Sequence, residues 1–405
     1  MNLFDGCWEF LFYQDTFSFY INKFDLSVMR VSGRFENDEF YCMPDTTFTD
    51  SIERESLLHS GYELSVGIND ACNMRCTYCY ANKRDKHNIN LQLLEERMQS
   101  LTNFSVQIIG VGEPLLDYDK FCELIEILRK YTKDIWLVTN GTLITTSIAN
   151  FLVSNKINVT VSIDGDKNTN DLNRRMNDGQ SSYDEAVSGI NRIYSASQTQ
   201  NISISIWLSS IVSKKNFNLI ENFIALSKLN CDFIMFRLYY GDDTEFLILL
   251  DDDIKKKLKE YVDFIFAEIV KGNNAILKII NVRDFVGKYI IRILSNNIVD
   301  KRCGAGISKS AYMCDNKEYI CDFCFGRNDL EIKNYQHFYS SDCIECHFKK
   351  ICGGSCQYMC YLGLGTYYCN FERWIIENVI INIIYLQENC SDVYEKLKKN
   401  CIKRG

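Results

Sequence analysis

The sequence predicts an α/β protein built on a partial (β/α)6 TIM-like barrel, with a small N-terminal β element before it and a C-terminal cysteine-rich domain after it. Strand-like and helix-like segments alternate six times between residues 61 and 250, which is the pattern of a parallel sheet with helices outside it. Short aromatic-rich runs precede this region, and ten of the nineteen cysteines fall between Cys303 and Cys369. The 405 residues suffice for one large core and a smaller second domain.

The barrel prediction comes from six short apolar runs that are separated by helix-like segments. The expected strands are Glu63–Gly67, Val106–Gly110, Ile135–Asn140, Val159–Asp164, Ile202–Ser209 and Phe233–Leu238. The expected helices are Leu91–Thr102, Tyr118–Tyr131, Thr145–Ser154, Tyr183–Ser197 and Leu219–Leu229. A barrel places its ligand-binding loops at the carboxyl ends of its strands, so we expect the functional residues there.

The regions outside the barrel have patterns of their own. Alternating runs at Trp8–Tyr13, Phe17–Ile21 and Leu26–Val31 predict a small antiparallel element. An apolar stretch, Trp374–Tyr385, continues into Val393–Lys399 and predicts a C-terminal helix. The expected regions are a β-rich element over 1–60, the barrel over 61–250, a helical linker over 251–299, the cysteine-rich domain over 300–372 and the C-terminal helix over 373–405.

Charge and hydropathy exclude several classes of protein. The net charge is −8 with no Lys/Arg-rich block before the last few residues, so a nucleic-acid partner is not expected. No run of 18 apolar residues occurs, and Met1–Glu9 has neither a basic nor an apolar signal region. We therefore expect a cytoplasmic protein without a membrane partner. In such a protein, clustered cysteines indicate metal sites rather than disulfides.

Three cysteines follow the first expected strand with the spacing Cys-x3-Cys-x2-Cys: Cys72, Cys76 and Cys79. Three thiolates on one loop can hold one face of a 4Fe-4S cluster, and because such clusters usually take four cysteines, one iron is left for another ligand. The alternatives are a zinc site or three core thiols. A structural zinc would need a fourth Cys or His close by, and the nearest histidine, His87, lies in a polar stretch.

This triad, with Tyr78 before its last cysteine, resembles the signature of the radical S-adenosylmethionine (SAM) superfamily. The loops after the second, third and fourth strands resemble family elements in the same order. The residues that the resemblance assigns to SAM are Tyr78, Gly112, Glu113, Pro114, Thr139, Asn140, Ser162, Asp164 and Arg174. Val111 departs from the family's Gly-Gly-Glu-Pro loop, and we expect Gly110 to supply the missing flexibility.

Each of these loops also has an ordinary structural interpretation, because Asn-Gly and Asp-Gly are common turn dipeptides. Their order favours function: one loop lies at each successive strand end behind the triad, where a barrel forms its active site.

The C-terminal cysteines resemble the SPASM extension, with Asn316 in the position of a hairpin glycine. Asn tolerates positive φ, so a tight turn at Asp315-Asn316 is still expected. The resemblance implies one auxiliary cluster on Cys303, Cys321 and Cys356, with Cys314, Cys324 or Cys360 as the fourth ligand or with an iron open to a substrate thiolate. It implies a second on Cys343, Cys346, Cys352 and Cys369. A double zinc ribbon is the alternative.

The resemblance implies an enzyme with SAM and three 4Fe-4S clusters as cofactors. Its expected partners are a peptide substrate with a leader sequence and an electron donor such as flavodoxin or ferredoxin. Residues 1–60 are a candidate docking element for the leader, and the alternative is a strand layer that only packs on the barrel. We expect a maturase that forms a Cys thioether crosslink in a ribosomally made peptide. The alternatives are an anaerobic sulfatase maturase, which makes formylglycine, and a non-catalytic iron-sulfur or zinc protein.

Overall fold

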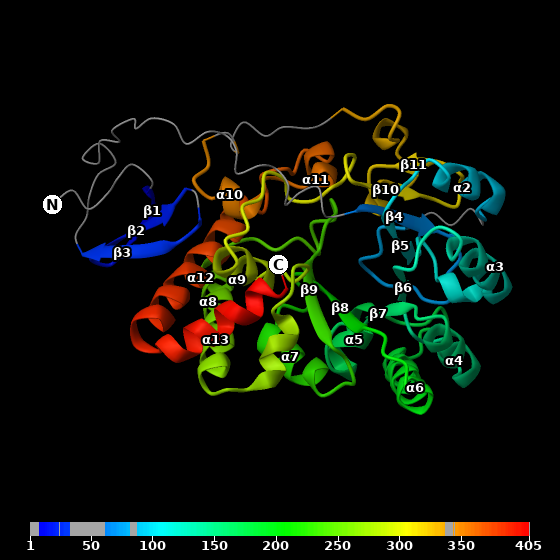
Figure 1. Cartoon of the computed structure of the whole chain (residues 1–405), viewed down its shortest axis with the longest axis horizontal. Coiled ribbons are helices and arrows are strands. Elements are labelled where there is room, and N and C mark those ends of the chain that lie inside the picture. Colours follow the sequence, from blue (N-terminus) through cyan, green and yellow to red (C-terminus); the bar gives the residue numbers. More distant parts are fainter. Residues whose placement is uncertain are drawn as a thin grey trace. The chain divides into compact units, whose positions relative to one another are not determined.

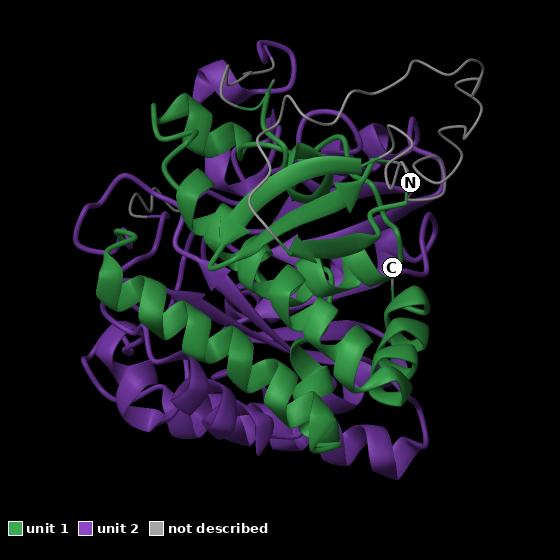
Figure 2. Ribbon diagram, turned by 90° about the vertical axis from the view of Figure 1, so that its left-hand side faces the viewer, with its two compact units in different colours: residues 1–57, 249–302, 339–405 green, residues 58–248, 303–338 purple. Residues whose placement is uncertain are grey.

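The computed structural model describes residues 8–23, 25–32, 61–81, 87–336, 343 and 345–404. The chain divides into two compact units, each made of separate segments (Figure 2). Unit 1 comprises residues 1–57, 249–302 and 339–405, and unit 2 comprises residues 58–248 and 303–338. The cysteine-rich region therefore contributes to both units.

Unit 2 is built on an eight-stranded sheet of order β11-β10-β4-β5-β6-β7-β8-β9 (Figure 1). Six consecutive strands of this sheet are β4 (Tyr62–Gly67), β5 (Phe104–Ile109), β6 (Ile135–Thr139), β7 (Asn158–Ser162), β8 (Ile206–Val212) and β9 (Phe233–Leu238). Each of these strands pairs with the next in parallel. The predicted six-strand parallel α/β architecture is confirmed.

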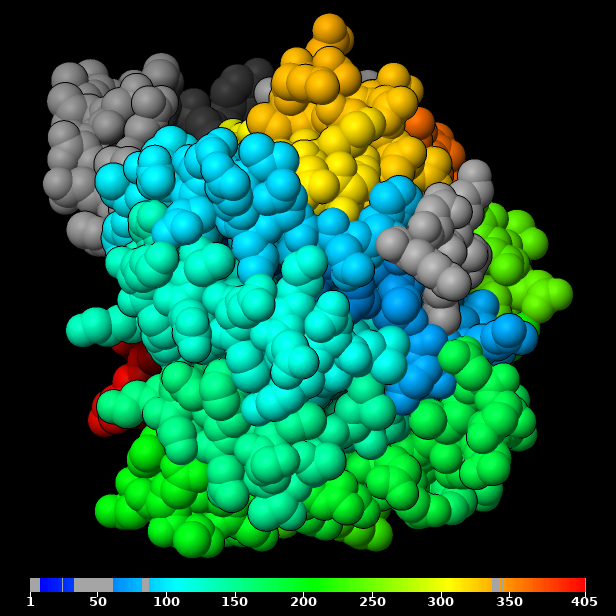
Figure 3. All heavy atoms as spheres, turned by 90° about the vertical axis from the view of Figure 1, so that its right-hand side faces the viewer, coloured from blue at the N-terminus to red at the C-terminus, as the bar shows by residue number. Residues whose placement is uncertain are grey.

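Five helices alternate with these strands and cover the outer side of the sheet (Figure 1). They are α2 (Leu91–Met98), α3 (Tyr118–Leu128), α4 (Thr146–Ser154), α6 (Tyr183–Gln200) and α7 (Leu219–Ser227). Each is amphipathic: α3, for example, buries Phe121, Leu124 and Leu128. The segment from α2 to α6 forms most of the surface seen in Figure 3.

A hairpin from the cysteine-rich region extends the sheet, which the sequence did not predict. β10 (Lys309–Tyr312) pairs in parallel with β4 and antiparallel with β11 (Glu318–Tyr319). The predicted turn between them is confirmed, because Asn316 has φ of 62°. Arg97 on α2 holds the hairpin by donating from Nε and Nη2 to the Glu318 carboxylate at 2.7 and 2.9 Å.

Unit 1 contains a three-stranded antiparallel sheet, as predicted, and a group of helices. The strands are β1 (Trp8–Gln14), β2 (Phe17–Asn22) and β3 (Val28–Ser32). The α-helices in its described part are α8 (Asp252–Val270), α9 (Gly287–Leu294), α10 (Lys349–Cys352), α11 (Gln357–Tyr361), α12 (Cys369–Asn389) and α13 (Ser391–Ile402). The expected single C-terminal helix is two helices, because Cys390 has a non-helical backbone (φ −141°, ψ 54°). None of the helices in the described residues could cross a membrane.

The positive φ at Asn316 yields a stability prediction. Asn316→Gly and Asn316→Ala both remove the side-chain oxygen that accepts from the Asn90 N–H at 2.6 Å, but only alanine carries a Cβ that opposes φ of 62°. We expect the glycine variant to be more stable than the alanine variant by about 1 kcal/mol. Urea unfolding monitored by circular dichroism measures the difference, and equal midpoints would contradict the strain argument.

Candidate active site

The triad Cys72, Cys76 and Cys79 lies in the loop between β4 and α2, at the carboxyl end of the first parallel strand. This loop is held along its length by the segment after α5 (Lys167–Asn173), a short helix that the sequence did not predict. The attachment consists of backbone and side-chain hydrogen bonds. They are Arg75 N to Arg175 O (2.9 Å), Thr77 N to Asn173 O (2.9 Å) and Asn177 Nδ2 to Cys72 O (2.8 Å).

The three thiols are close enough to affect one another. Burial, followed by the nearby Cys79, Asp164 and Cys72, raises the pKa of Cys76 to about 11, although Arg174 opposes the shift. A thiol with such a pKa stays protonated at neutral pH until a metal replaces its proton. Within the described part of the chain, no three Cys, His, Asp or Glu side chains are grouped to hold a single metal ion.

The carboxylate of Glu113 connects two neighbouring strand-end loops. Its Oε1 accepts from Thr139 Oγ1 at 2.7 Å and its Oε2 accepts from the Asn140 N–H at 2.8 Å. The side chain is 2% exposed, and burial raises its pKa while these donors oppose the rise. Pro114 begins the 3-10 turn Pro114–Leu116, for which Glu113 is the N-cap. The sequence predicted the residues of this loop, but not the carboxylate's partners.

Gly112 allows the Glu113 loop to touch the cysteine loop. A Cβ on Gly112 would lie 1.9 Å from the Ala71 carbonyl oxygen, and the adjacent Glu113 N–H donates to that same oxygen at 2.7 Å. A Cβ on Gly110 would lie 1.7 Å from the Gly112 oxygen. Gly110 thus provides space at the position before Val111, whose side chain is buried. A side chain at Gly112 would force these two loops apart, and one at Gly110 would distort the Glu113 loop itself.

A chain of amide and hydroxyl groups joins the third strand end to the triad loop. Asn140 Nδ2 donates to Asn73 Oδ1 at 2.9 Å, and Asn73 Nδ2 donates to Thr142 Oγ1 at 2.9 Å. Asn140 Oδ1 also accepts from the Thr142 N–H and hydroxyl at 2.9 and 2.7 Å. Asn73 is the residue directly after Cys72, so this network fixes the orientation of the loop. Sequence reasoning missed Asn73 and Thr142, although both are polar residues inside recognised motifs.

Tyr78, Asp164 and Arg174 form a second buried group. The Tyr78 hydroxyl donates to Asp164 Oδ2 at 2.8 Å and accepts from Arg174 Nη1 at 2.9 Å. Burial raises the pKa of Asp164 to about 6, against the opposing charge of Arg174. Burial would lower the pKa of Arg174, but the negative groups of Cys76, Tyr78 and Asp164 outweigh it and raise that pKa. The structure thus brings these three predicted residues together beside the triad.

The remaining predicted SAM residue is Ser162, which ends β7 and pairs with Ser209 of β8. Two buried polar atoms near these loops have no hydrogen-bond partner: Asn69 Oδ1 and Asn173 Nδ2. Orphaned buried polar atoms commonly mark a site for a missing ligand. A paired Arg174, these free polar groups and three adjacent thiols suit an iron-sulfur cluster with an amino-acid ligand. The residues present therefore fit both an iron-sulfur cluster and the SAM that would bind to it.

The C-terminal cysteines are divided between the units. Cys303, which is exposed, and Cys314, Cys321 and Cys324 belong to unit 2, whereas Cys356 and Cys360 belong to unit 1. The Sγ atoms of Cys321 and Cys324 are 3.4 Å apart. The four cysteines expected to bind the second auxiliary cluster, Cys343, Cys346, Cys352 and Cys369, all belong to unit 1.

Cys352, one of the unit 1 cysteines, ends α10 at a turn that α9 supports. Arg292 Nη1 donates to the carbonyls of Ile351 and Cys352 at 2.8 and 3.1 Å. Gly353 and Gly354 follow Cys352 with φ of 81° and 92°, so glycine is required for the turn. Burial, Cys343 and Cys352 raise the pKa of Cys369 to about 11. These thiols are therefore mutual neighbours.

A buried carboxylate fixes the same region from α12. Glu372 accepts hydrogen bonds from Lys288 (3.2 Å), Tyr289 and Arg302. Burial would raise the pKa of Glu372, but the charges of Arg302 and Lys288 lower it to about 2. Because the Tyr289 hydroxyl also lies 4.0 Å from Cys352 Sγ, this ion cluster supports the cysteine turn.

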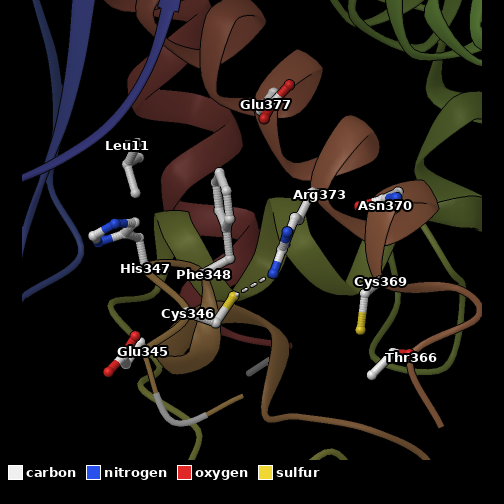
Figure 4. Close-up of a pocket in the computed structure, with 10 residues that line it drawn as sticks. All are labelled: Leu11, Glu345, Cys346, His347, Phe348, Thr366, Cys369, Asn370, Arg373 and Glu377. Carbon is white, nitrogen blue, oxygen red and sulfur yellow. Dashed lines mark hydrogen bonds between the residues drawn. The ribbon is translucent and has the colours of Figure 1, made fainter. Parts of the chain in front are cut away.

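Two of these cysteines line a cavity of about 930 Å³ in unit 1 (Figure 4). Its lining comprises Leu11, Glu345, Cys346, His347, Phe348, Thr366, Cys369, Asn370, Arg373 and Glu377. Arg373 points toward Cys346, and its Nη2 lies 3.6 Å from the Sγ atom (Figure 4). A guanidinium donating to a sulfur stabilises negative charge there. Sequence reasoning missed Arg373, which carries no motif of its own.

Comparisons with known proteins identify a family for part of the chain. Residues 66–214 match the model of the radical SAM superfamily. A cysteine-type anaerobic sulfatase-maturating enzyme of Clostridium perfringens is 27% identical over 71% of this chain and 86% of its own length. The radical SAM cyclopropyl synthase TigE of Paramaledivibacter caminithermalis is 24% identical over 84% of this chain and 74% of its own. The uncharacterized protein MJ0907 of Methanocaldococcus jannaschii is 28% identical, and the match spans only 56% of it.

Solved structures of the same kind share the fold. Native anSMEcpe with bound AdoMet aligns with a TM-score of 0.63 and 21% identity, over 81% of this chain and 99% of that one. Streptococcus suis SuiB bound to its precursor peptide SuiA aligns with a TM-score of 0.53 and 16% identity, over 85% of this chain and 93% of that one. These alignments are longer than the barrel alone, so the likeness extends beyond residues 66–214.

The buried Glu113 carboxylate yields a prediction. In Glu113→Gln the new amide NH2 would face a backbone N–H that now meets an oxygen, that of Leu115 or that of Asn140. We expect a loss of about 1–3 kcal/mol in the free energy of unfolding. The control is Glu123→Gln on the exposed side of α3, which should change little. Urea unfolding of both variants measures the effect, and equal stabilities would contradict a linking role for Glu113.

Proposed function

We propose that the chain, whose residues 66–214 match the radical SAM superfamily, is a SPASM-containing maturase that oxidises a residue of a peptide or protein substrate. The observation that carries the proposal is that the loop with the three cysteines is hydrogen-bonded to the buried residues Glu113, Asn140 and Arg174. This loop lies at the carboxyl ends of the strands of one parallel sheet. The relatives support the substrate class, because they include sulfatase-maturating enzymes and SuiB, whose structure holds a precursor peptide.

In this proposal each group at the strand ends has a part. Cys72, Cys76 and Cys79 would hold three irons of a 4Fe-4S cluster and leave the fourth for SAM. Arg174, charged and buried, suits a carboxylate, and the loop fixed by Glu113 suits an amino group. When bound, these cofactors supply a 5′-deoxyadenosyl radical that abstracts a C–H hydrogen. The buried walls of the sheet exclude water from the reaction.

The reaction we favour joins a cysteine sulfur of the substrate to a carbon of another residue. Forming this thioether removes two hydrogens: one leaves carbon as a hydrogen atom, and the other leaves sulfur as a proton while one electron is released. A nearby auxiliary cluster can take that electron. We propose the thiols of Cys343, Cys346, Cys352 and Cys369 for one such cluster, with an external donor such as flavodoxin or ferredoxin reducing the radical-forming cluster.

A second candidate is the conversion of a cysteine or serine of a sulfatase to formylglycine. The alignment with the Clostridium perfringens enzyme over 86% of its length favours it. Incubation of the reconstituted protein with a cysteine-rich precursor peptide, or with a peptide containing Cys-x-Pro-x-Arg, separates the candidates by mass spectrometry. The loss of two hydrogens with a new sulfur–carbon bond supports the thioether reaction. An aldehyde in the second peptide, with the first unchanged, would replace it.

The radical-forming step predicts a clean difference between two cysteine variants. The protein, reconstituted anaerobically with iron and sulfide and reduced with dithionite, should form 5′-deoxyadenosine from SAM. Cys76→Ala should reduce this product to background, because the cluster loses a ligand. Cys122→Ala, on the remote helix α3, should retain it. Liquid chromatography measures the product. A wild-type protein without product, or a Cys76→Ala variant with undiminished product, would contradict the assignment.

Arg373 predicts a shift in the redox behaviour of the cluster that we place on the unit 1 cysteines. Removing the guanidinium from Cys346 Sγ withdraws a positive charge and a hydrogen bond, which makes an added electron less stable. We expect Arg373→Gln to lower the reduction potential of that cluster and Arg373→Lys to recover part of the loss. A potentiometric titration followed by electron paramagnetic resonance measures it. An unchanged potential in Arg373→Gln would exclude this role.

A further inference from the structure

We infer that Cys324 is a ligand of the first auxiliary cluster, next to Cys321, and fills the position that the SPASM resemblance leaves unassigned. This inference rests on the proposed function, because it assumes that the cluster forms. It also bears on the reaction: an iron held by Cys324 is not free to bind a substrate thiolate. The cluster would then take an electron from the substrate without coordinating it.

The first support is the placement of the two sulfurs. Cys321 and Cys324 are three residues apart, and their Sγ atoms lie 3.4 Å from each other. The 3-10 turn Asp322–Cys324 produces this arrangement, with the Cys324 N–H donating to the Cys321 carbonyl at 3.1 Å. Two thiols turned toward each other in this way present a ready pair of metal ligands.

The second support is a close parallel within the same unit. In the radical-forming triad, the Cys79 N–H donates to the Cys76 carbonyl at 3.2 Å. The Cys-x2-Cys spacing and the turn hydrogen bond are therefore the same at Cys76–Cys79 and at Cys321–Cys324. A turn that suits two cluster ligands at the first position suits them equally at the second.

The third support is the position of this turn beside the triad loop. Phe323, between the two cysteines, packs against Tyr80 with ring centroids 4.8 Å apart. Tyr80 directly follows Cys79, so the two cysteine turns are joined by one aromatic contact. A cluster ligated at Cys321 and Cys324 would therefore lie close to the radical-forming site, where an electron acceptor for the substrate is needed.

The other two candidates for the unassigned position have different surroundings. Cys314 is buried beside the carboxylates of Asp70 and Asp315. Cys360 lies near Cys343 of unit 1, and Cys343 is one of the ligands expected for the second cluster. Cys324, at 0% exposure, is the candidate with a cysteine sulfur at contact distance from an assigned ligand.

The test uses the full chain with Cys72→Ala, Cys76→Ala and Cys79→Ala, so that only auxiliary clusters form. After anaerobic reconstitution, iron and sulfide are counted and the reduced protein is studied by electron paramagnetic resonance. Adding Cys324→Ala should remove about four irons per chain or change the signal of one cluster. Adding Cys314→Ala instead should change neither. The inference is overturned if Cys324→Ala leaves iron and signal unchanged, or if Cys314→Ala has the effect instead.

A second measurement adds a thiol to the parent protein, the chain with Cys72→Ala, Cys76→Ala and Cys79→Ala, before any substitution at Cys324. The signal of the parent protein with closed auxiliary clusters should not change when a small thiol, 2-mercaptoethanol, is added, whereas the Cys324→Ala protein should acquire a thiol-dependent shift. A shift in the parent would show an open iron and contradict the inference. Failure of the proposed function is distinguishable, because it would appear as absence of 5′-deoxyadenosine in the wild-type chain while the iron content still responds to Cys324.

Discussion

The buried carboxylate of Glu113 is the interaction on which the arrangement of the site depends. It accepts hydrogen bonds from Thr139 and from the Asn140 N–H, while its own N–H donates to the carbonyl of Ala71. One residue thereby joins the ends of β5 and β6 to the loop that carries the cysteine triad. This contact is possible only because Gly112 has no side chain to strike Ala71. The thiols are thus placed by the parallel sheet rather than by a loop alone.

Two further buried charges work in the same way, each within its own unit. In unit 2, Arg174 and Asp164 meet at the Tyr78 hydroxyl, directly before Cys79. In unit 1, Glu372 accepts hydrogen bonds from Lys288, Tyr289 and Arg302 next to the turn at Cys352. Buried ionic groups are costly unless they are paired. Their presence beside cysteines is consistent with sites whose ligands must be held before the cofactor binds.

The sequence was sufficient for features that depend on local pattern. The strand Phe233–Leu238 and the turn at Asn316 lie where they were predicted, because a short apolar run and tolerance of positive φ are local properties. Non-local features were missed. The pairing of β10 with β4 depends on a contact between distant segments, and helix α5, with the sequence KNTNDLN, has no apolar period to reveal it. β8 begins at Ile206 rather than at the predicted Ile202 for the same reason, because its pairing with β7 determines where the strand starts.

The same distinction between local and non-local features applies to the candidate site. Its residue types were recognisable from motif order, whereas the hydrogen bonds among Asn73, Asn140 and Thr142, and the approach of Arg373 to Cys346, required the fold. The proposed function requires that the Cys72–Cys79 loop hold a cluster with an iron open to SAM. Electron paramagnetic resonance of the reduced wild-type protein before and after addition of SAM tests this requirement. We expect a SAM-dependent change in one cluster signal that is absent from Cys76→Ala, and an unchanged wild-type signal would exclude an open iron at this loop.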